Sequence, residues 1–169
     1  MIVKMHYDKD KGQSIAIFSD CNFYRYVLER TWNYNGLRCL FVMLNPSTAD
    51  EIKNDPTIER CERRARELGF GSLRVCNIFA YRSTDPKMMK TVVDPIGAEN
   101  NNWISACCKW SDTIICAWGC HGSHLGRGEQ VERMLRTSVE AAFHLGLTKE
   151  GHPKHPLYVT YEKEPEQWF

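Results

Sequence analysis

The sequence predicts a single α/β domain with a mainly parallel four-stranded sheet, helices on both faces, and an N-terminal β-hairpin extension over residues 1–36. Short apolar runs alternate along the chain with longer segments of helical periodicity, which is typical of a parallel sheet covered on both faces. The 169 residues suit one domain that is large enough to bury a core. We find no internal repeat, low-complexity segment or linker, so we expect one domain over residues 1–169.

Two segments near the N-terminus, residues 13–18 and 23–30, are rich in β-branched and aromatic residues. Only the short polar segment 19–22 separates them. This arrangement is typical of an antiparallel hairpin with a short loop. We expect the hairpin to extend or cover one edge of the sheet.

The first strand of the predicted sheet is the wholly apolar run over residues 39–44. A short apolar run that ends at a breaker favours a buried strand over a helix. Pro46 cannot continue a central ladder, and it restricts the backbone of Asn45. The chain therefore leaves the sheet here and presents Asn45 and Ser47 at the carboxyl end of the strand, where open α/β sheets bind their ligands.

A helix is predicted directly after this turn. Asp55 suits its N-cap, Pro56 its first turn, and Gly69 its C-terminal stop. Apolar residues recur at helical spacing and form a core-facing stripe, namely Ile58, Cys61, Ala65 and Leu68. The remaining face carries Arg60, Arg63, Arg64 and Arg66. Because glutamates alternate with these arginines, we favour a solvated face over a phosphate-binding stripe.

Three further strands and two further helices complete the prediction. The strands cover residues 72–80, 112–118 and 157–161, and the helices cover residues 97–110 and 129–145. Parallel strands end at the same edge of a sheet, so their polar ends should share one rim. These ends are Asn45 to Ser47, Asn77 with Arg82, Trp118 to His124, and His152 to Pro156.

The composition is that of an ordinary globular protein. Basic residues number 22 and acidic residues 21, so the chain lacks the net basic excess common among nucleic-acid-binding proteins. We see neither a membrane-spanning run nor a signal-peptide pattern, and we expect a cytoplasmic monomer that does not bind membranes. The eight cysteines form no CxxC pair, and we expect reduced thiols.

The strand-end motifs resemble those of the uracil-DNA glycosylase superfamily. LNPS at 44–47 is similar to the first motif of its mismatch-specific uracil and thymine branch, and VCNIFAYR at 75–82 is similar to its Asn-bearing strand. GHPKHPL at 151–157 is similar to its HPSPL loop with one extra residue. The resemblance implies a uracil-DNA-glycosylase-like fold and a role in DNA repair or in phage DNA modification or defence. The whole chain also resembles a family of small bacterial and phage proteins of unknown function.

The resemblance implies catalytic roles for Asn45 and for His152 and His155, and a base-recognition role for Asn77. Asn45 would hold the attacking water, and Asn77 would read the Watson–Crick edge of an extruded base. His152 or His155 would stabilise negative charge on the departing base. This assignment agrees with the chemistry, because breaking an N-glycosidic bond develops positive charge on the sugar and negative charge on the base.

The resemblance also implies substrate contacts. Ser47 and the backbone amides after Pro46 would contact the base or a nearby phosphate. Arg82 is a candidate for phosphate contact, although we favour its pairing with Asp85 in its own loop.

The superfamily places a base-stacking aromatic shortly after its first motif, and residues 48–57 contain none. Phe79, Tyr81 or Trp118 would have to replace it. Trp118 precedes the turn at Gly119, and for this side chain packing is favoured over stacking.

Three functions remain open at this point. The first is an enzyme, a DNA glycosylase that hydrolyses the base–sugar bond of a pyrimidine, including a modified one, flipped out of DNA. The second is a module on the same fold that binds a nucleobase, nucleotide or DNA without cutting it.

The third function is a zinc-dependent hydrolase. Its candidate ligands are Cys120, His121, His124, His152 and His155. This spacing matches no standard zinc motif, so we expect neither a metal nor another cofactor.

Overall fold

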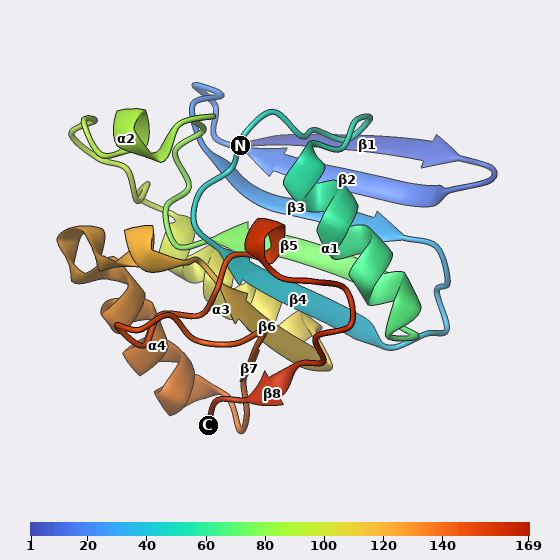
Figure 1. Ribbon diagram of the computed structural model, residues 1–169. Coiled ribbons are helices and arrows are strands. Elements are labelled where there is room, and N and C mark those ends of the chain that lie inside the picture. The colour runs from blue at the N-terminus through green and yellow to red at the C-terminus, as the bar shows by residue number, and fades with distance from the viewer.

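The computed structural model describes residues 1–169 as an α/β domain built on one eight-stranded mixed sheet (Figure 1). The sheet order is β1-β2-β3-β5-β4-β6-β7-β8. The strands are β1 Ile2–Asp8, β2 Gly12–Phe18, β3 Arg25–Thr31, β4 Arg38–Met43, β5 Ser72–Asn77, β6 Thr113–Ala117, β7 Phe143–His144 and β8 Glu166–Gln167. The α-helices are α1 Pro56–Glu67, α2 Pro86–Met89, α3 Asn100–Trp110 and α4 Arg127–Ser138, and the 3₁₀ helices are η1 Cys120–Gly126 and η2 Pro156–Tyr158.

The α/β class is confirmed, but the predicted mainly parallel four-stranded sheet is wrong. Only β5, β4, β6 and β7 run parallel to one another. The predicted hairpin extension is a three-stranded antiparallel unit, and β3 joins it to β5 with Leu28 opposite Val75. All seven residues of β3 are buried. The N-terminal strands therefore form part of the main sheet and do not merely cover its edge.

The predicted fourth strand is also wrong. Residues 157–161 begin in η2 and continue as turn and coil, and the fourth parallel strand is β7. β7 lies inside the segment predicted as a helix over residues 129–145, because α4 already ends at Ser138. A two-residue strand carries too little periodicity to be detected in a sequence.

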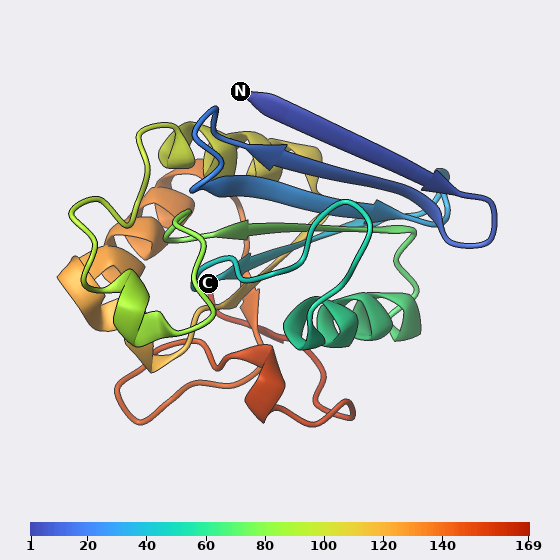
Figure 2. The same ribbon diagram turned by 90° about the horizontal axis from the view of Figure 1, so that it is seen from above.

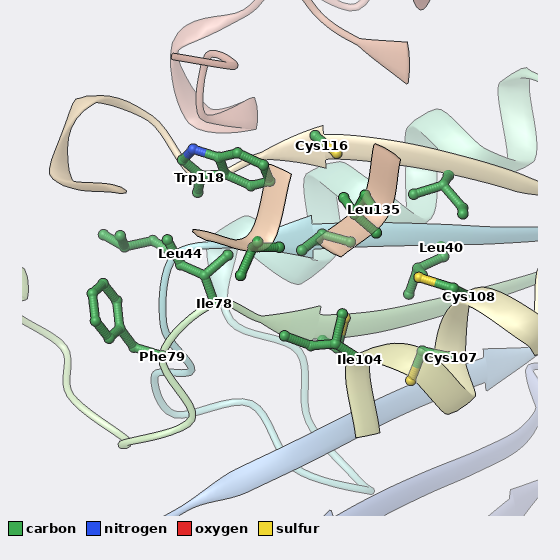
Figure 3. Close-up of a cluster of buried hydrophobic side chains, with 14 of the residues drawn as sticks. Leu40, Leu44, Ile78, Phe79, Ile104, Cys107, Cys108, Cys116, Trp118 and Leu135 are labelled. Atoms are coloured by element: carbon green, nitrogen blue, oxygen red, sulfur yellow. The ribbon is translucent and has the colours of Figure 1, made fainter. Parts of the chain in front are cut away.

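The helices cover both faces of the sheet, with α1 on one face and α3 and α4 on the other (Figure 2). Each face has its own hydrophobic cluster. The cluster under α3 and α4 contains four of the eight free cysteines, among them Cys107 and Cys108 (Figure 3). Burial raises the pKa of Cys108 to about 12, so this thiol packs as a small neutral hydrophobe. No helix is long and apolar enough to span a membrane.

Two arginines of α1 hold the C-terminal segment against the domain. Arg64 is buried and donates to the carbonyls of Thr160, Tyr161 and Lys163. Arg60 donates to the carbonyls of Pro156, the first residue of η2, and Val159, the residue directly after it. The prediction of a wholly solvated arginine face is therefore wrong for these two side chains, which fix the segment that carries η2.

Candidate functional site

A pocket of about 910 Å³ opens between the carboxyl ends of β4 and β6. These strands are neighbours, but β4 connects through α1 to β5 on one side while β6 connects through α4 to β7 on the other. Such a reversal of direction leaves a crevice, where open α/β sheets bind their ligands. The volume is in the range of small-molecule sites and exceeds the size of one nucleobase.

Asn45 lies in the turn after β4 with a fixed amide orientation. Its Nδ2 donates to the carbonyls of Pro46 at 3.1 Å and Ser83 at 2.8 Å. The Ser83 amide in turn donates to the Pro46 carbonyl at 2.8 Å, so the turns after β4 and β5 are tied together. The amide nitrogen is thus fully engaged, whereas Asn45 Oδ1 has no protein donor and remains available as an acceptor in the pocket lining.

His155 lines the same pocket and lies directly before η2. Its pKa is lowered from 6.5 to about 4, mainly by burial; Asp55 opposes the shift and the nearby His121 adds to it. The Leu157 amide donates to His155 Nδ1 at 3.4 Å. Because this bond uses Nδ1 as the acceptor, the neutral ring carries its hydrogen on Nε2. The site therefore contains a neutral imidazole donor at pH 7.

The turn after β6 packs closely against His155 and requires a glycine at position 119. Gly119 has a φ of +71°, which few residues other than glycine adopt, and a side chain there would also meet His155 Cβ at 3.4 Å. Its amide donates to the Pro153 carbonyl at 2.7 Å. This contact connects the end of the central sheet to the segment that presents the histidine.

Asp55 is the only acidic side chain in the pocket lining, and its carboxylate is already engaged. It caps α1 by accepting from the Ile58 amide at 2.9 Å, and it also accepts from the Ala49 amide at 3.4 Å. The buried guanidinium of Arg25 lies nearby; burial lowers its pKa to about 10 and Asp55 opposes the shift. The pocket therefore holds no unengaged carboxylate that could act as a general base.

Cationic groups lie at the mouth of the pocket. Lys154 lines it and is exposed. Lys90, just beyond α2, donates to His121 Nδ1 at 3.1 Å. Burial, together with the Lys90 charge, lowers the pKa of His121. These groups make the entrance favourable for an anion such as a phosphate.

The pocket rim also carries exposed aromatic and apolar surface. Tyr158 is 84% exposed, and its ring centroid lies 6.0 Å from that of His155. Leu157 is 39% exposed beside it. An aromatic ring at this position can stack on a planar ligand.

Five residues predicted from the sequence come together in this pocket: Asn45, Ser47, Trp118, Gly119 and His155. Trp118 contributes mainly by packing, because it is 1% exposed and contacts Trp168 edge to face at 5.6 Å. The other predicted residues, Pro46, Asn77, Phe79, Arg82 and His152, are not among the side chains that line it.

The structure accounts for these five residues in other ways. Pro46 contributes its carbonyl to the turn, and Phe79 is fully buried 5.6 Å from the ring of His124. The backbone of His152 closes a turn with Thr148.

Asn77 is 1% exposed, and neither atom of its amide group has a partner. Arg82 donates to Asn22 and lies over the Phe18 ring at 5.0 Å, so the expected pair with Asp85 is not formed. Asp85 instead caps α2.

Sequence reasoning missed several lining residues, including Asp55, Thr57, Thr84 and Tyr158. Asp55 and Thr57 could have been found, because the N-terminus of a helix that follows a parallel strand lies at the same rim. Tyr158 was missed because its segment was read as a strand.

The histidines and cysteines do not assemble a metal site. No group of three His, Cys, Asp or Glu side chains is arranged to hold a metal ion. The zinc-hydrolase hypothesis therefore lacks a ligand set.

Residues 25–157 match the family described as "Protein of unknown function (DUF1643)". The chain belongs to this family. The finding corrects the resemblance to the uracil-DNA glycosylase superfamily, which has no match in this chain. Neither a curated protein nor a solved structure matches the chain significantly.

Proposed function

We propose that the pocket binds a pyrimidine nucleotide of DNA, including a modified one, and hydrolyses its N-glycosidic bond. The observation that carries the proposal is the presence of two preorganised groups in the lining of one pocket. Asn45 offers a fixed, unpartnered acceptor oxygen, and His155 offers a neutral N–H donor. An N-glycosidic hydrolase needs both groups, one for the water and one for the departing base.

In this mechanism the bond between C1′ and the base nitrogen breaks, and its electron pair stays on the base. His155 Nε2–H donates to the base oxygen that gains negative charge. Asn45 Oδ1 accepts a hydrogen bond from a water, whose oxygen bonds to C1′ and whose proton passes to solvent. Because Asp55 is engaged in capping, catalysis depends on positioning and electrostatics and not on a carboxylate base.

The surroundings of the two groups support a nucleotide as the ligand. The volume accommodates a sugar and phosphate as well as a base. Lys154 and the Lys90–His121 pair place positive charge at the mouth, where a phosphate would lie. Tyr158 offers an exposed ring for stacking.

Two observations favour a second candidate, a nucleotide-binding module without catalysis. The amide of Asn77 is buried outside the pocket lining, and no free carboxylate faces the ligand. Binding through Tyr158, Lys154 and the hydroxyl-bearing lining requires neither group.

An abasic-site assay separates the two functions. Oligonucleotides containing uracil, hydroxymethyluracil or mismatched thymine are incubated with the protein, and abasic sites are detected by alkaline strand cleavage. We expect cleavage by the wild type and a loss of on the order of 100-fold in Asn45→Ala, the size expected when a positioned catalytic group is removed. The matched control is Asn35→Ala, an exposed site in the loop before β4.

The same variants are tested for folding by circular dichroism and for binding to the oligonucleotides. No cleavage of any substrate, combined with binding that Tyr158→Ala abolishes, would establish the binding module in place of the hydrolase. Cleavage that Asn45→Ala leaves unchanged would refute the proposed water site.

A further inference from the structure

The first strand presents a row of exposed apolar side chains at the outer edge of the sheet. β1 is the terminal strand and pairs only with β2 (Figure 1). Val3, Met5 and Tyr7 alternate along it and are 58%, 60% and 68% exposed. Val3 lies opposite Ile17, and Met5 lies opposite Ile15, so the apolar surface continues onto β2.

The rest of the chain does not cover this surface. On the same face, α3 packs over β3, β4 and β5, and β1 lies beyond it at the outer edge (Figure 2). β1 has no proline, and its register with β2 is regular from Ile2 to Asp8. Proline, bulges and edge lysines are devices by which proteins protect sheet edges. β1 lacks the first two and carries a single lysine, Lys4, so its backbone can still act as a template for another strand.

The hairpin of β1 and β2 also lies outside residues 25–157, which match the family. The exposed edge is therefore carried by a part of the chain that the family match does not include. No residue of this edge lines the pocket, so a role for the edge is independent of the proposed function.

We propose that a second copy of this chain covers the edge, with the two β1 strands antiparallel about a two-fold axis at His6. In this register Lys4 of each copy lies opposite Asp8 of the other, and Met5 lies opposite Tyr7. Opposite charges and apolar pairs directly across an antiparallel ladder are stabilising, and two-fold symmetry makes each pair twice. The two sheets become one continuous sheet.

The charges select this register among the symmetric ones. An axis at Met5 places Lys4 opposite His6, and an axis at Lys4 places the two lysines opposite each other. Only the axis at His6 sets Lys4 directly against Asp8. The dimer replaces the monomer expected from the sequence.

Sedimentation equilibrium of the full chain tests the association. We expect the wild type to show the mass of two chains and the double variant Met5→Lys/Tyr7→Lys to show the mass of one. Both side chains are exposed, so the variant should keep its fold, which circular dichroism checks. The matched control is Met88→Lys/Val93→Lys, two exposed apolar residues in α2 and in the loop after it, outside the β1–β2 hairpin, which should remain dimeric.

Disulfide trapping tests the register in a Cys21→Ser/Cys120→Ser background, which removes the two exposed thiols. Under oxidation, His6→Cys should form a covalent dimer faster than Met5→Cys. A monomeric wild type, or a double lysine variant that remains dimeric, would overturn the proposal. Preferential trapping through Met5→Cys would overturn the register.

Discussion

His155 couples the stability of the protein to pH in a predictable direction. Its pKa is about 4 in the folded protein, whereas the ordinary value of 6.5 applies once the chain unfolds. At a pH between these two pKa values the imidazole is protonated in the unfolded state but not in the folded state. The free energy of unfolding therefore falls as the pH falls from 6.5 towards 4. One pH unit between two pKa values corresponds to about 1.4 kcal/mol, which gives a loss of about 3 kcal/mol over the whole window.

The variant His155→Asn isolates this contribution. Its Oδ1 can still accept from the Leu157 amide, but the side chain does not titrate. Urea unfolding at pH 7.0, 6.0, 5.0 and 4.5 should therefore show a steeper fall for the wild type than for the variant. His121 and His144, whose pKa values are also lowered by burial, remain in both proteins, so the difference between the two profiles reports His155 together with its interaction with His121.

His152→Asn is the matched control, since His152 belongs to the same segment but not to the pocket lining. It should follow the wild-type profile. Parallel profiles for the wild type and His155→Asn would refute the claim that His155 is held neutral. The proposed donor role would then fail as well, because it requires a neutral ring at the pH of the assay.

Two further substitutions test how the site is supported. Arg64→Met leaves three carbonyls of the C-terminal segment without their donor, so the free energy of unfolding should drop by about 2–4 kcal/mol and hydrogen exchange should accelerate there. Arg66→Met, at an exposed position on the same helix whose side chain pairs with Glu62 and lies over Trp32, should change the unfolding energy by no more than about 1 kcal/mol, and equal losses would contradict the anchoring role. Gly122→Ala would place a Cβ 2.2 Å from Trp118 Cδ1 and should lower the thermal midpoint by displacing η1, at a cost of about 1–3 kcal/mol. Gly126→Ala meets no atom within 4 Å and should cost only the left-handed backbone penalty of about 1 kcal/mol, so a larger effect there than at Gly122 would contradict the packing argument.

The elements predicted best from the sequence are those whose signals are local. The helix α1 begins after Asp55, whose side chain accepts from the Ile58 amide as an N-cap should. The strands β4, β5 and β6 follow from their apolar runs, and their ends meet at one rim as predicted. The elements missed depend on long-range contacts. Residues 157–161 have a strand-like sequence, but arginine side chains from α1 satisfy the carbonyls of this segment instead of a neighbouring strand.

The two strand-end asparagines, Asn45 and Asn77, show which side-chain positions a sequence motif can predict and which it cannot. Asn77 is the last residue of β5, and by the two-residue period of a strand it shares a face with Leu73 and Val75, which are buried under α1. Asn45 lies beyond the end of β4, where Pro46 has already turned the chain out of the sheet. Both asparagines have the parity of the face under α1, because Met43 lies opposite Asn77 and belongs to the same cluster as Val75, so the period does not distinguish them. They differ because Asn77 is still part of β5, whereas Asn45 lies beyond the end of β4 and lines the pocket. With Asn77 turned into the core, ligand discrimination has to come from the loops around the crevice, so substitutions in residues 83–86 and in η2 should change specificity more than substitutions in the strands.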